Sequence, residues 1–432
     1  MDDNRAAEVG RQTGGQGMHV LAKPIGPVCD IDCEYCFYLE KRALFGKTEH
    51  YRMPDDVLAA YIEQYVASQS TPVVEFTWHG GEPTLLGIDF YRKVVELQKP
   101  YREHKEIRNS LQTNGVRLTD EWCEFFKTNN FFIGVSIDGP KDIHDRYRKD
   151  RKGGSTFDRV MAGIRLLQKH GVEFNALACV ARHTAHHPLE VYRFFKEAGI
   201  NYIQFSPIVE RLPDTETDEQ GLWLARPAII ASDEPNKQVT SWTVEPEVYG
   251  DFLIAIYEEW VRNDVGEMFV MNFEWAMSPW VGEESPVCIF SRRCGRAVAL
   301  EHNGNLYACD HYVYPEYQLG NVLSDNLGEM VDQSVASGFG PHKETSLPRW
   351  CLECDVLTSC WGGCPKHRFT NTPDGEPGLH YLCAGYKKFF QHIRKYQSAM
   401  TTLLQNDLPL SLVMQAMKGP LVIRKSQQES DK

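Results

Sequence analysis

The chain has 432 residues, of which 42% are hydrophobic and 24% charged, and a formal net charge of −13 at pH 7. This length suits a globular protein of two or three domains. The acidic balance argues against nucleic-acid and membrane-surface partners, which bind basic patches, and no continuous apolar stretch reaches the roughly 20 residues of a membrane span. We expect a cytoplasmic protein, in which cysteines serve metals or catalysis more often than disulfides.

The first 17 residues are polar and rich in Gly and Gln, without the basic and apolar regions of a signal peptide. We expect residues 1–17 to form a disordered leader. A short strand is expected at 19–23.

Three cysteines then fall within eight positions: Cys29, Cys33 and Cys36. A structural zinc site would need a fourth ligand, but His50 lies beyond a helix-like run at 39–45, and Asp30 or Asp32 would be an unusual substitute. An iron-sulfur cluster needs a ligand at every iron, so three thiolates on a 4Fe-4S cube leave one iron free for a substrate or cofactor. The spacing favours such a cluster over zinc, and both over a chance grouping.

Strand-like and helix-like segments alternate after the triplet. We expect strands at 73–79, 107–113, 132–138, 173–180 and 202–208, and helices at 55–68, 89–101, 119–127, 155–170 and 189–198, with Thr119 as an N-cap. Such repeats predict right-handed crossovers and a parallel sheet of six strands, open or closed into a barrel. Chemistry gathers at the carboxyl ends of such strands, which is where Cys29, Gly80 to Pro83 and Asn114 fall.

The strand at 133–138 places Gly134, Ser136 and Asp138 on one face. A small and polar face suits a cavity that holds a ligand. Asp138 and Gly139 could instead form only a turn, but a turn does not account for Ser136. Two isolated cysteines, Cys123 and Cys179, are interpreted as buried small apolar residues.

Residues 209–243 lose the periodicity and are interpreted as an insertion or linker, followed by helices at 246–263 and about 271–281. Eight further cysteines then follow: Cys288, Cys294, Cys309, Cys351, Cys354, Cys360, Cys364 and Cys383. Eight thiolates fit two complete four-ligand sites. Two zinc ribbons are the structural alternative, but a chain with one iron-sulfur motif favours two further clusters.

The Cys-x3-Cys-x2-Cys run with Tyr35 before its last cysteine resembles the radical S-adenosylmethionine (SAM) enzymes, in which SAM chelates the open iron. The later cysteines resemble the SPASM extension of radical SAM peptide-modifying enzymes. Residues 19–390 together resemble the anaerobic sulfatase-maturating enzymes. The motifs that carry this are Gly80-Gly81-Glu82-Pro83-Thr84, Ser110-Leu111-Gln112-Thr113-Asn114-Gly115, Ser136-Ile137-Asp138-Gly139-Pro140, Tyr307-Ala308-Cys309-Asp310 and Cys360-Trp361-Gly362-Gly363-Cys364.

The resemblance implies an α/β fold, with a partial (β/α)6 TIM-like radical SAM barrel at 18–243 that includes the polar insertion at 209–243. A helical connector at 244–287, a SPASM domain with two auxiliary clusters at 288–390, and a C-terminal helix and tail at 391–432 would follow. By resemblance, Cys288, Cys294, Cys309 and Cys364 hold the first auxiliary cluster, and Cys351, Cys354, Cys360 and Cys383 the second. Spacing alone does not give this interleaving.

The resemblance also implies a SAM site of Tyr35, Gly81, Ser136, Arg148 and the backbone near Val209. Without it, Arg148 would be a surface charge in the basic run 146–152. Asp310 would be the base that deprotonates the substrate, with a pKa raised by desolvation toward neutrality; it could instead cap a turn, and His311 is an alternative base. His79 departs from the glutamine expected before the double glycine.

The implied cofactors are SAM and three 4Fe-4S clusters. The implied reaction is oxidation of a cysteine or serine in a sulfatase Cys/Ser-x-Pro-x-Arg motif to Cα-formylglycine, with an electron donor such as flavodoxin or ferredoxin. Another SPASM peptide modifier, which forms thioether or carbon-carbon crosslinks, is the alternative enzyme, although such enzymes often carry an N-terminal peptide-recognition domain for which the leader is short. A non-catalytic iron-sulfur electron carrier is the alternative outside the enzymes, but it has no need of an open iron.

Overall fold

The structure is a computed structural model that describes residues 17–46, 50–227 and 238–417. The expected leader, except Gly17, lies outside these ranges, as do residues 228–237 of the expected insertion and the end of the expected tail. Within the described residues the main sheet has ten strands, in the order β12-β11-β10-β1-β3-β4-β5-β7-β8-β9.

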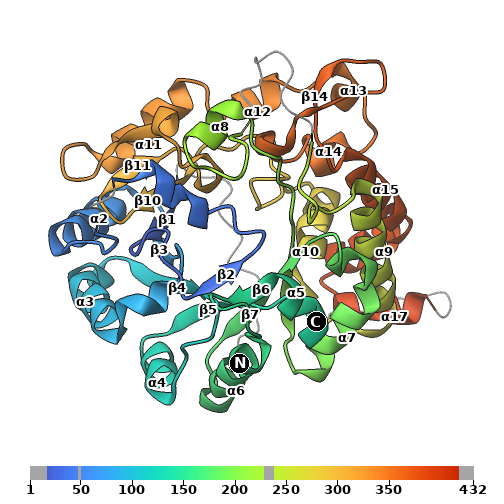
Figure 1. Ribbon diagram of the computed structural model, residues 1–432. Coiled ribbons are helices and arrows are strands. Elements are labelled where there is room, and N and C mark those ends of the chain that lie inside the picture. The colour runs from blue at the N-terminus through green and yellow to red at the C-terminus, as the bar shows by residue number, and fades with distance from the viewer. Residues whose placement is uncertain (1–16, 47–49, 228–237, 418–432) are drawn as a thin grey trace, which may run out of the picture.

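Six parallel strands form the expected partial barrel, and Figure 1 shows them around the centre of the molecule with helices outside. They are β1 (His19–Lys23), β3 (Val73–Trp78), β4 (Glu106–Thr113), β5 (Phe131–Ser136), β7 (Phe174–Val180) and β8 (Tyr202–Pro207), and the short β9 (Phe269–Val270) extends the sheet beyond β8. The predicted α/β fold with a partial TIM-like barrel is therefore confirmed. The sequence predicted a strand that continues through Asp138, but β5 ends at Ser136, so Asp138 lies just after this strand.

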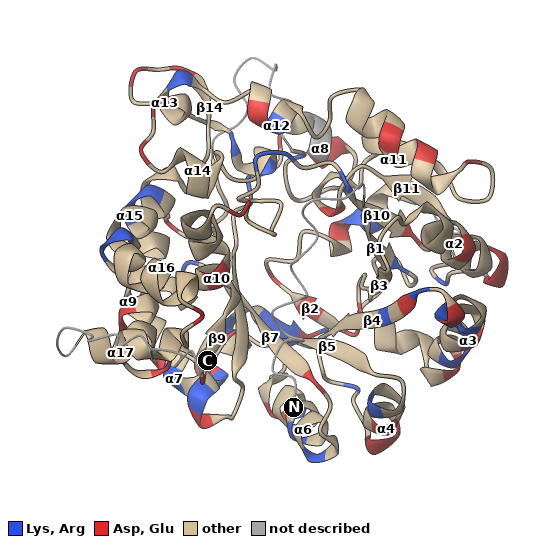
Figure 2. Ribbon diagram, turned by 180° about the vertical axis from the view of Figure 1, so that it is seen from behind, with Lys and Arg blue, Asp and Glu red and all other residues tan. Residues whose placement is uncertain are grey.

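The predicted helices appear in the predicted order, and the structure adds two helices that the sequence did not predict, at 141–147 and 215–219. Together they are α2 (Asp55–Ser68), α3 (Ile88–Gln98), α4 (Asp120–Thr128), α5 (Lys141–Tyr147), α6 (Phe157–His170) and α7 (Pro188–Glu197), followed by α8 (Thr215–Glu219), α9 (Pro246–Asn263) and α10 (Met271–Met277). Thr119 caps α4 as expected, because its hydroxyl accepts a hydrogen bond from the Trp122 amide. Figure 2 shows that most Lys, Arg, Asp and Glu residues lie on the outer helices, whereas the strands are mostly uncharged.

Alternation along β3 explains how the sheet separates a core from an interior. Val74, Phe76 and Trp78 are fully buried in the main hydrophobic core. Thr77, which alternates with them, faces the other way, and its hydroxyl lies 2.9 Å from that of Ser110 on β4. On these two strands, small polar side chains therefore face the barrel interior.

The sheet continues across the domain boundary expected at residue 288. Strand β10 (Ala297–Glu301) pairs in parallel with β1, with His19 opposite Ala297, and the antiparallel strands β11 (Asn305–Tyr307) and β12 (Gln318–Asn321) complete that edge. The remaining elements are β2 (Ile31–Cys33), β6 (Arg148–Asp150), β13 (Thr370–Asn371), β14 (Pro377–Leu379), α11 (Leu327–Ala336), α12 (His342–Thr345), α13 (Arg349–Leu352), α14 (Leu357–Cys360), α15 (Cys383–Ile393), α16 (Gln397–Gln405) and α17 (Val413–Ala416).

Helices α9 and α15 cross at two glycines, Gly250 and Gly385. A Cβ atom on Gly250 would lie 2.7 Å from the Cα of Gly385, and one on Gly385 would lie 1.9 Å from the Pro246 carbonyl oxygen. This close approach fixes the C-terminal cysteine region against the barrel. Among the described residues, no helix is both long and apolar enough to cross a membrane.

Candidate active site

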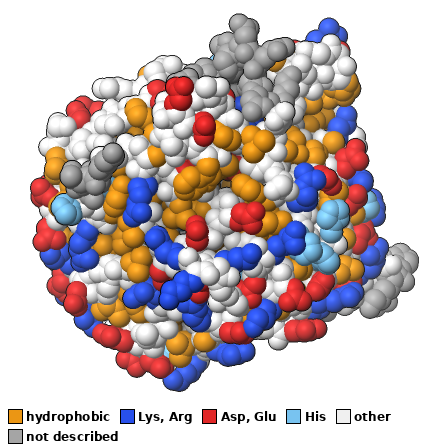
Figure 3. All heavy atoms as spheres, in the orientation of Figure 1, with side chains coloured by type: hydrophobic (Ala, Val, Ile, Leu, Met, Phe, Trp, Pro, Cys, Tyr) orange, Lys and Arg blue, Asp and Glu red, His pale blue; other side chains and the backbone are white. Residues whose placement is uncertain are grey.

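The cysteine triplet lies in the loop that follows β1. Cys33 ends β2, which pairs with β6 so that Cys33 lies opposite Arg148, and the Cys36 amide donates to the Cys33 carbonyl at 3.0 Å. All three thiols line one cavity of about 380 Å³. The structure therefore brings the predicted cluster ligands to one place. Figure 3, in the orientation of Figure 1, shows hydrophobic side chains near the centre of the visible face, with charged side chains around them.

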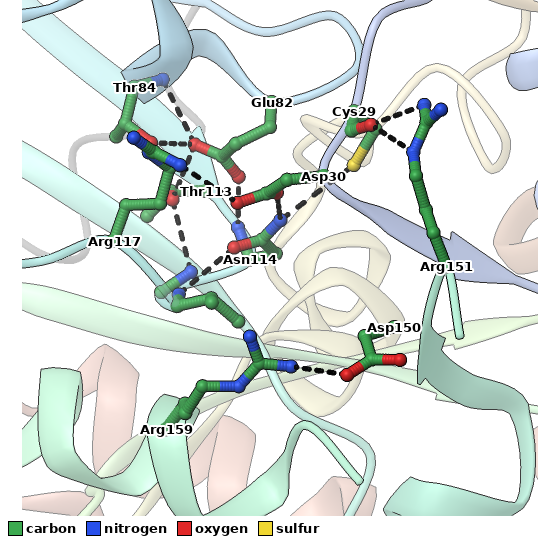
Figure 4. A network of polar contacts seen from close by, with 12 residues as sticks. Cys29, Asp30, Glu82, Thr84, Thr113, Asn114, Arg117, Asp150, Arg151 and Arg159 are labelled. Atoms are coloured by element: carbon green, nitrogen blue, oxygen red, sulfur yellow. Dashed lines mark hydrogen bonds and ion pairs between the residues drawn. The ribbon is translucent and has the colours of Figure 1, made fainter. Parts of the chain in front are cut away.

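The Cys29 end of this loop is held by side chains from other parts of the barrel (Figure 4). Arg151 donates from Nε to the Cys29 carbonyl at 2.9 Å, and Asn114 donates to an Asp30 carboxylate oxygen at 2.8 Å. The Asn114 amide nitrogen Nδ2 also lies 3.7 Å from the Cys29 sulfur. The position of this thiol is thus set by the ends of β4 and β6.

Glu82 connects the ends of β3 and β4 behind the same loop. It is fully buried, and its carboxylate accepts from the Thr84 hydroxyl at 2.6 Å, the Thr113 hydroxyl at 2.8 Å and the Asn114 amide at 2.7 Å. The Gly81 and Glu82 amides donate to the carbonyls of Gly26 and Val28, both at 2.8 Å. Sequence reasoning singled out Gly81 here but gave Glu82 no role.

The residues expected at the SAM site line the same cavity as the triplet: Tyr35, Gly81, Ser136, Arg148 and Val209. Ser136 accepts a hydrogen bond from Gln112 at 2.9 Å, which places two polar strand residues in the interior. Arg148 is buried and is not the surface charge that the run 146–152 alone would suggest.

Asp138 gathers the polar groups on this side of the cavity. Its carboxylate accepts from the Tyr35 hydroxyl at 2.5 Å, from Arg148 Nε at 3.0 Å and from the Cys179 amide at 2.9 Å. Arg148 also contacts the sulfurs of Cys33, at 3.8 Å, and Cys179, at 3.4 Å. The interpretation of Cys179 as a buried apolar residue is wrong, because it lines the cavity in a polar network. Cys123 lies fully buried in the core as expected.

Asp310 reaches this cavity from the C-terminal region and forms an ion pair with Lys23 at the end of β1. Burial by itself would raise the pKa of Asp310, but Lys23, with His79 and His311, outweighs it and lowers the pKa to about 2. The expectation of a raised pKa is therefore wrong, because sequence reasoning had no sign of the lysine. Asp310 is an ionised carboxylate held by a fixed cation.

Lys23 is 1% exposed and also contacts the ring of Tyr38. Its ammonium is 3.4 Å from the centre of the Tyr38 ring, and the Tyr38 hydroxyl donates to both oxygens of Glu301 on β10, at 2.7 and 2.8 Å. His79 borders the same cavity, and its Nδ1 accepts from the Gly80 amide at 2.8 Å. Burial lowers the pKa of His79 to about 4, so the ring is neutral at pH 7.

The eight later cysteines separate into two groups in space. Cys288, Cys294, Cys309 and Cys364 line one cavity of about 750 Å³, and Cys351, Cys354, Cys360 and Cys383 line another. These are the two interleaved sets that the resemblance implies.

All 13 cysteines are free thiols. Within the described residues, no three His, Cys, Asp or Glu side chains are placed to hold a single metal ion, whereas a 4Fe-4S cube binds one thiolate at each of four separate irons.

Comparison with known proteins gives two matching families. Residues 24–195 match the Radical SAM superfamily, and residues 288–355 match the SPASM iron-sulfur cluster-binding domain. The first range contains the cysteine triplet, and the second contains five of the eight later cysteines, whereas Cys360, Cys364 and Cys383 lie beyond its end.

Three individual proteins extend the likeness over most of the chain. A serine-type anaerobic sulfatase-maturating enzyme of Bacteroides thetaiotaomicron is 47% identical, over 93% of this chain and 95% of its own. A cysteine-type enzyme of Clostridium novyi is 29% identical, over 87% of this chain and 95% of its own. The solved structure of native anSMEcpe with bound AdoMet and Cp18Cys peptide is 28% identical with a TM-score of 0.76, over 89% of this chain and 99% of that chain.

Proposed function

The chain belongs to the anaerobic sulfatase-maturating enzymes, radical SAM enzymes with a SPASM domain, and from this premise we propose that it oxidises an active-site serine of a sulfatase to Cα-formylglycine. The observation that carries the proposal is the shared cavity. It joins the triplet, the expected SAM contacts and Asp310 in about 380 Å³, so a radical source and a proton acceptor face the same space.

The residues present fit the cofactors of this chemistry. Cys29, Cys33 and Cys36 would hold three irons of a cluster and leave the fourth for SAM, and when bound these supply a 5′-deoxyadenosyl radical that removes a hydrogen atom. Tyr35, Gly81, Ser136, Arg148 and Val209 would position SAM. The two later thiol groups would hold the auxiliary clusters.

Asp310 would accept the hydroxyl proton of the substrate serine as its Cβ is oxidised. Lys23 holds the carboxylate ionised and oriented, so Asp310 is ready to receive a proton without first losing one. A carboxylate of low pKa is a weak base toward an unactivated hydroxyl. We therefore place the proton transfer after hydrogen-atom removal, when the hydroxyl of the carbon radical has become more acidic.

The preference for serine rests on relatedness and on one cavity residue. The serine-type relative is 47% identical and the cysteine-type relative 29%, and His79 stands where the family resemblance predicted glutamine. We further propose a Ser-x-Pro-x-Arg substrate motif, a flavodoxin or ferredoxin as electron donor, and a cytoplasmic location, where 13 free thiols suit a reducing compartment.

The proposal is tested by anaerobic reconstitution with iron, sulfide, SAM and a chemical reductant, followed by mass spectrometry of paired peptides. The peptides carry Ser-x-Pro-x-Arg or Cys-x-Pro-x-Arg and are otherwise identical. We expect formylglycine from both peptides and faster turnover of the serine peptide. Formation of 5′-deoxyadenosine without oxidation of either peptide would refute the maturase function while leaving the radical SAM chemistry intact.

A further inference from the structure

Two basic side chains are buried beside the later cysteines, and the structure pairs neither with a carboxylate among the residues it describes. Lys343 is 0% exposed and Arg368 is 4% exposed. Lys366, also buried in this region, differs from both, because it forms an ion pair with Glu210 at 2.6 Å. Removing a charge from water is unfavourable by several kcal/mol unless an opposite charge is near.

Lys343 uses its ammonium to hold the segment that carries Cys288. It donates to the carbonyls of Cys288 at 2.6 Å and Ile289 at 3.1 Å, and to that of Ser291. These three bonds use all three donors of an ammonium. Backbone carbonyls satisfy its hydrogen bonds but leave its positive charge uncompensated.

Arg368 organises the turn between Cys360 and Cys364. Its guanidinium donates to the carbonyls of Gly362 and Trp361, both at 2.8 Å, and to that of Lys343 at 2.6 Å. The turn lies in the left-handed region, with φ of 44° at Trp361 and 64° at Gly362. A Cβ on Gly362 would lie 2.9 Å from Arg368 Nη2, so the turn is wrapped closely around the guanidinium.

The two cations together reach both cysteine groups. Lys343 donates to the carbonyl of Cys288, which belongs to the first group. Arg368 donates to the carbonyls of Trp361 and Gly362 in the turn that joins Cys360 of the second group to Cys364 of the first. Its bond to the Lys343 carbonyl links the two cations.

We infer that Lys343 and Arg368 are fixed counter-charges for the two auxiliary clusters and raise their reduction potentials. A cluster bound by four thiolates is a net anion, and net charge near a cluster sets its potential. A buried cation favours the reduced form, which carries one more negative charge. The role rests on the proposed function, in which the carbon radical of the substrate loses one electron and its hydroxyl proton to become an aldehyde, and an auxiliary cluster is reduced by that one electron.

The test is an EPR-monitored redox titration of reconstituted Lys343→Met without peptide, with SAM added to mark the signal of the N-terminal cluster. We expect about twelve irons per chain and an unchanged reduction potential of the N-terminal cluster. The reduction potential of the auxiliary clusters should become more negative by at least about 59 mV, which corresponds to a tenfold change in the one-electron reduction equilibrium. The double variant Lys366→Met with Glu210→Gln is the matched control, since it removes a buried lysine with its neutralising partner. Auxiliary potentials that stay at the wild-type value, or that shift as much in the control, would overturn the inference.

A second pair of variants covers the case in which Lys343→Met does not assemble its clusters. Arg368→Lys keeps the charge and loses the planar donor geometry, whereas Arg368→Gln loses the charge. We expect Arg368→Lys to retain more iron after reconstitution and desalting than Arg368→Gln. Equal loss from both would show that hydrogen-bond geometry alone is at work and would overturn the charge role. Because neither measurement uses a sulfatase peptide, these outcomes are independent of whether the maturase function holds.

Discussion

Lys23 at the end of the first barrel strand forms an ion pair with Asp310, the residue after Cys309 in the SPASM domain. The pairing of β1 with β10 brings the two segments together, and the aromatic ring of Tyr38 also contacts the ammonium, with 3.4 Å between the ammonium and the ring centre. The carboxylate that faces the cavity is therefore held in place by the barrel and not by its own domain.

Replacing either partner is expected to separate SAM cleavage from peptide oxidation. Asp310→Asn removes the proposed proton acceptor, so formylglycine formation should fall by about 10²- to 10⁴-fold while 5′-deoxyadenosine still forms. Lys23→Met leaves the carboxylate present but unpaired, and we expect a smaller loss. The measurement is the ratio of formylglycine to 5′-deoxyadenosine by mass spectrometry.

Lys93→Met is a suitable control for the lysine variant, since Lys93 is 46% exposed and pairs with Asp55 at 2.6 Å on the outer surface. A wild-type product ratio in Lys23→Met would show that the ion pair does not position the base.

Asp138→Asn is expected to destabilise the protein and weaken SAM binding. Asp138 is fully buried and is the negative partner of the buried Arg148. Removing one partner of a buried pair leaves the other charge uncompensated, at about 3–5 kcal/mol. Chemical denaturation and a SAM titration measure the two effects.

The exposed pair Lys141–Asp158 offers a control for this substitution. Asp158→Asn should change the free energy of unfolding by about 1 kcal/mol or less. Similar losses of unfolding free energy in Asp138→Asn and Asp158→Asn would show that the burial of Asp138 does not increase its contribution to stability.

Gly81→Ala is expected to disrupt the cysteine loop, because a Cβ at this position would lie 2.0 Å from the Val28 carbonyl oxygen. The loop backbone must move, which displaces Cys29 directly after Val28. We expect the reconstituted protein to lack about four irons, the content of one of its three proposed clusters. A Cβ on Gly46 would meet no atom within 4 Å, so Gly46→Ala should retain full iron content; full iron content in Gly81→Ala would contradict the steric argument.

Local sequence patterns predicted the barrel elements closely. Helices α2 and α9 have the predicted bounds, and Thr119 caps α4. Hydrophobic periodicity and capping depend on residues within one or two turns of each other, so a single sequence contains the information. The cysteine triplet and the count of eight later cysteines were equally visible in the chain, but the division of those eight into two interleaved sets came from the family resemblance and not from their spacing.

Contacts between distant segments were not predictable in this way. The pairing of His19 with Ala297 joins strands that are far apart in the chain. The lowered pKa of Asp310 depends on Lys23, and the role of Asp138 depends on Arg148 and Cys179, none of which the spacing relates. Cys179 has the pattern of a core strand residue, and only the barrel geometry turns it toward the cavity.

Glu274 on α10 predicts a pH-dependent stability. Burial raises its pKa to about 7, above the usual value of 4.5. Between pH 4.5 and pH 7, the native state therefore keeps a proton that the unfolded state has lost. Stability therefore falls as pH rises from 4.5 through 7. Glu274→Gln cannot ionise and should raise the free energy of unfolding at pH 8.5 by up to about 3 kcal/mol, at about 1.4 kcal/mol for each unit of pKa.

Urea denaturation at pH 4.5 and pH 8.5 measures this effect, with most of the gain expected at the higher pH. Glu247→Gln, on the exposed first turn of α9, should give the same small difference at both pH values. An equal gain from Glu274→Gln at both pH values would point to better packing and not to removal of a buried charge.

His79 is expected to favour a serine substrate over a cysteine substrate. Because its Nδ1 accepts from the Gly80 amide and burial keeps the ring neutral, the ring hydrogen lies on Nε2 as a donor. A hydroxyl oxygen accepts such a bond well, whereas a thiol sulfur accepts it weakly. His79→Leu should therefore lower kcat/KM for the serine peptide by about 5- to 10-fold, the value of one hydrogen bond near 1 kcal/mol, and for the cysteine peptide by less.

His79→Gln restores a donor and should recover part of the serine activity, while His50→Leu, at an exposed position outside the cavity lining, should leave both peptides unaffected. Equal losses for the two peptides in His79→Leu would show that His79 shapes the cavity without selecting the substrate.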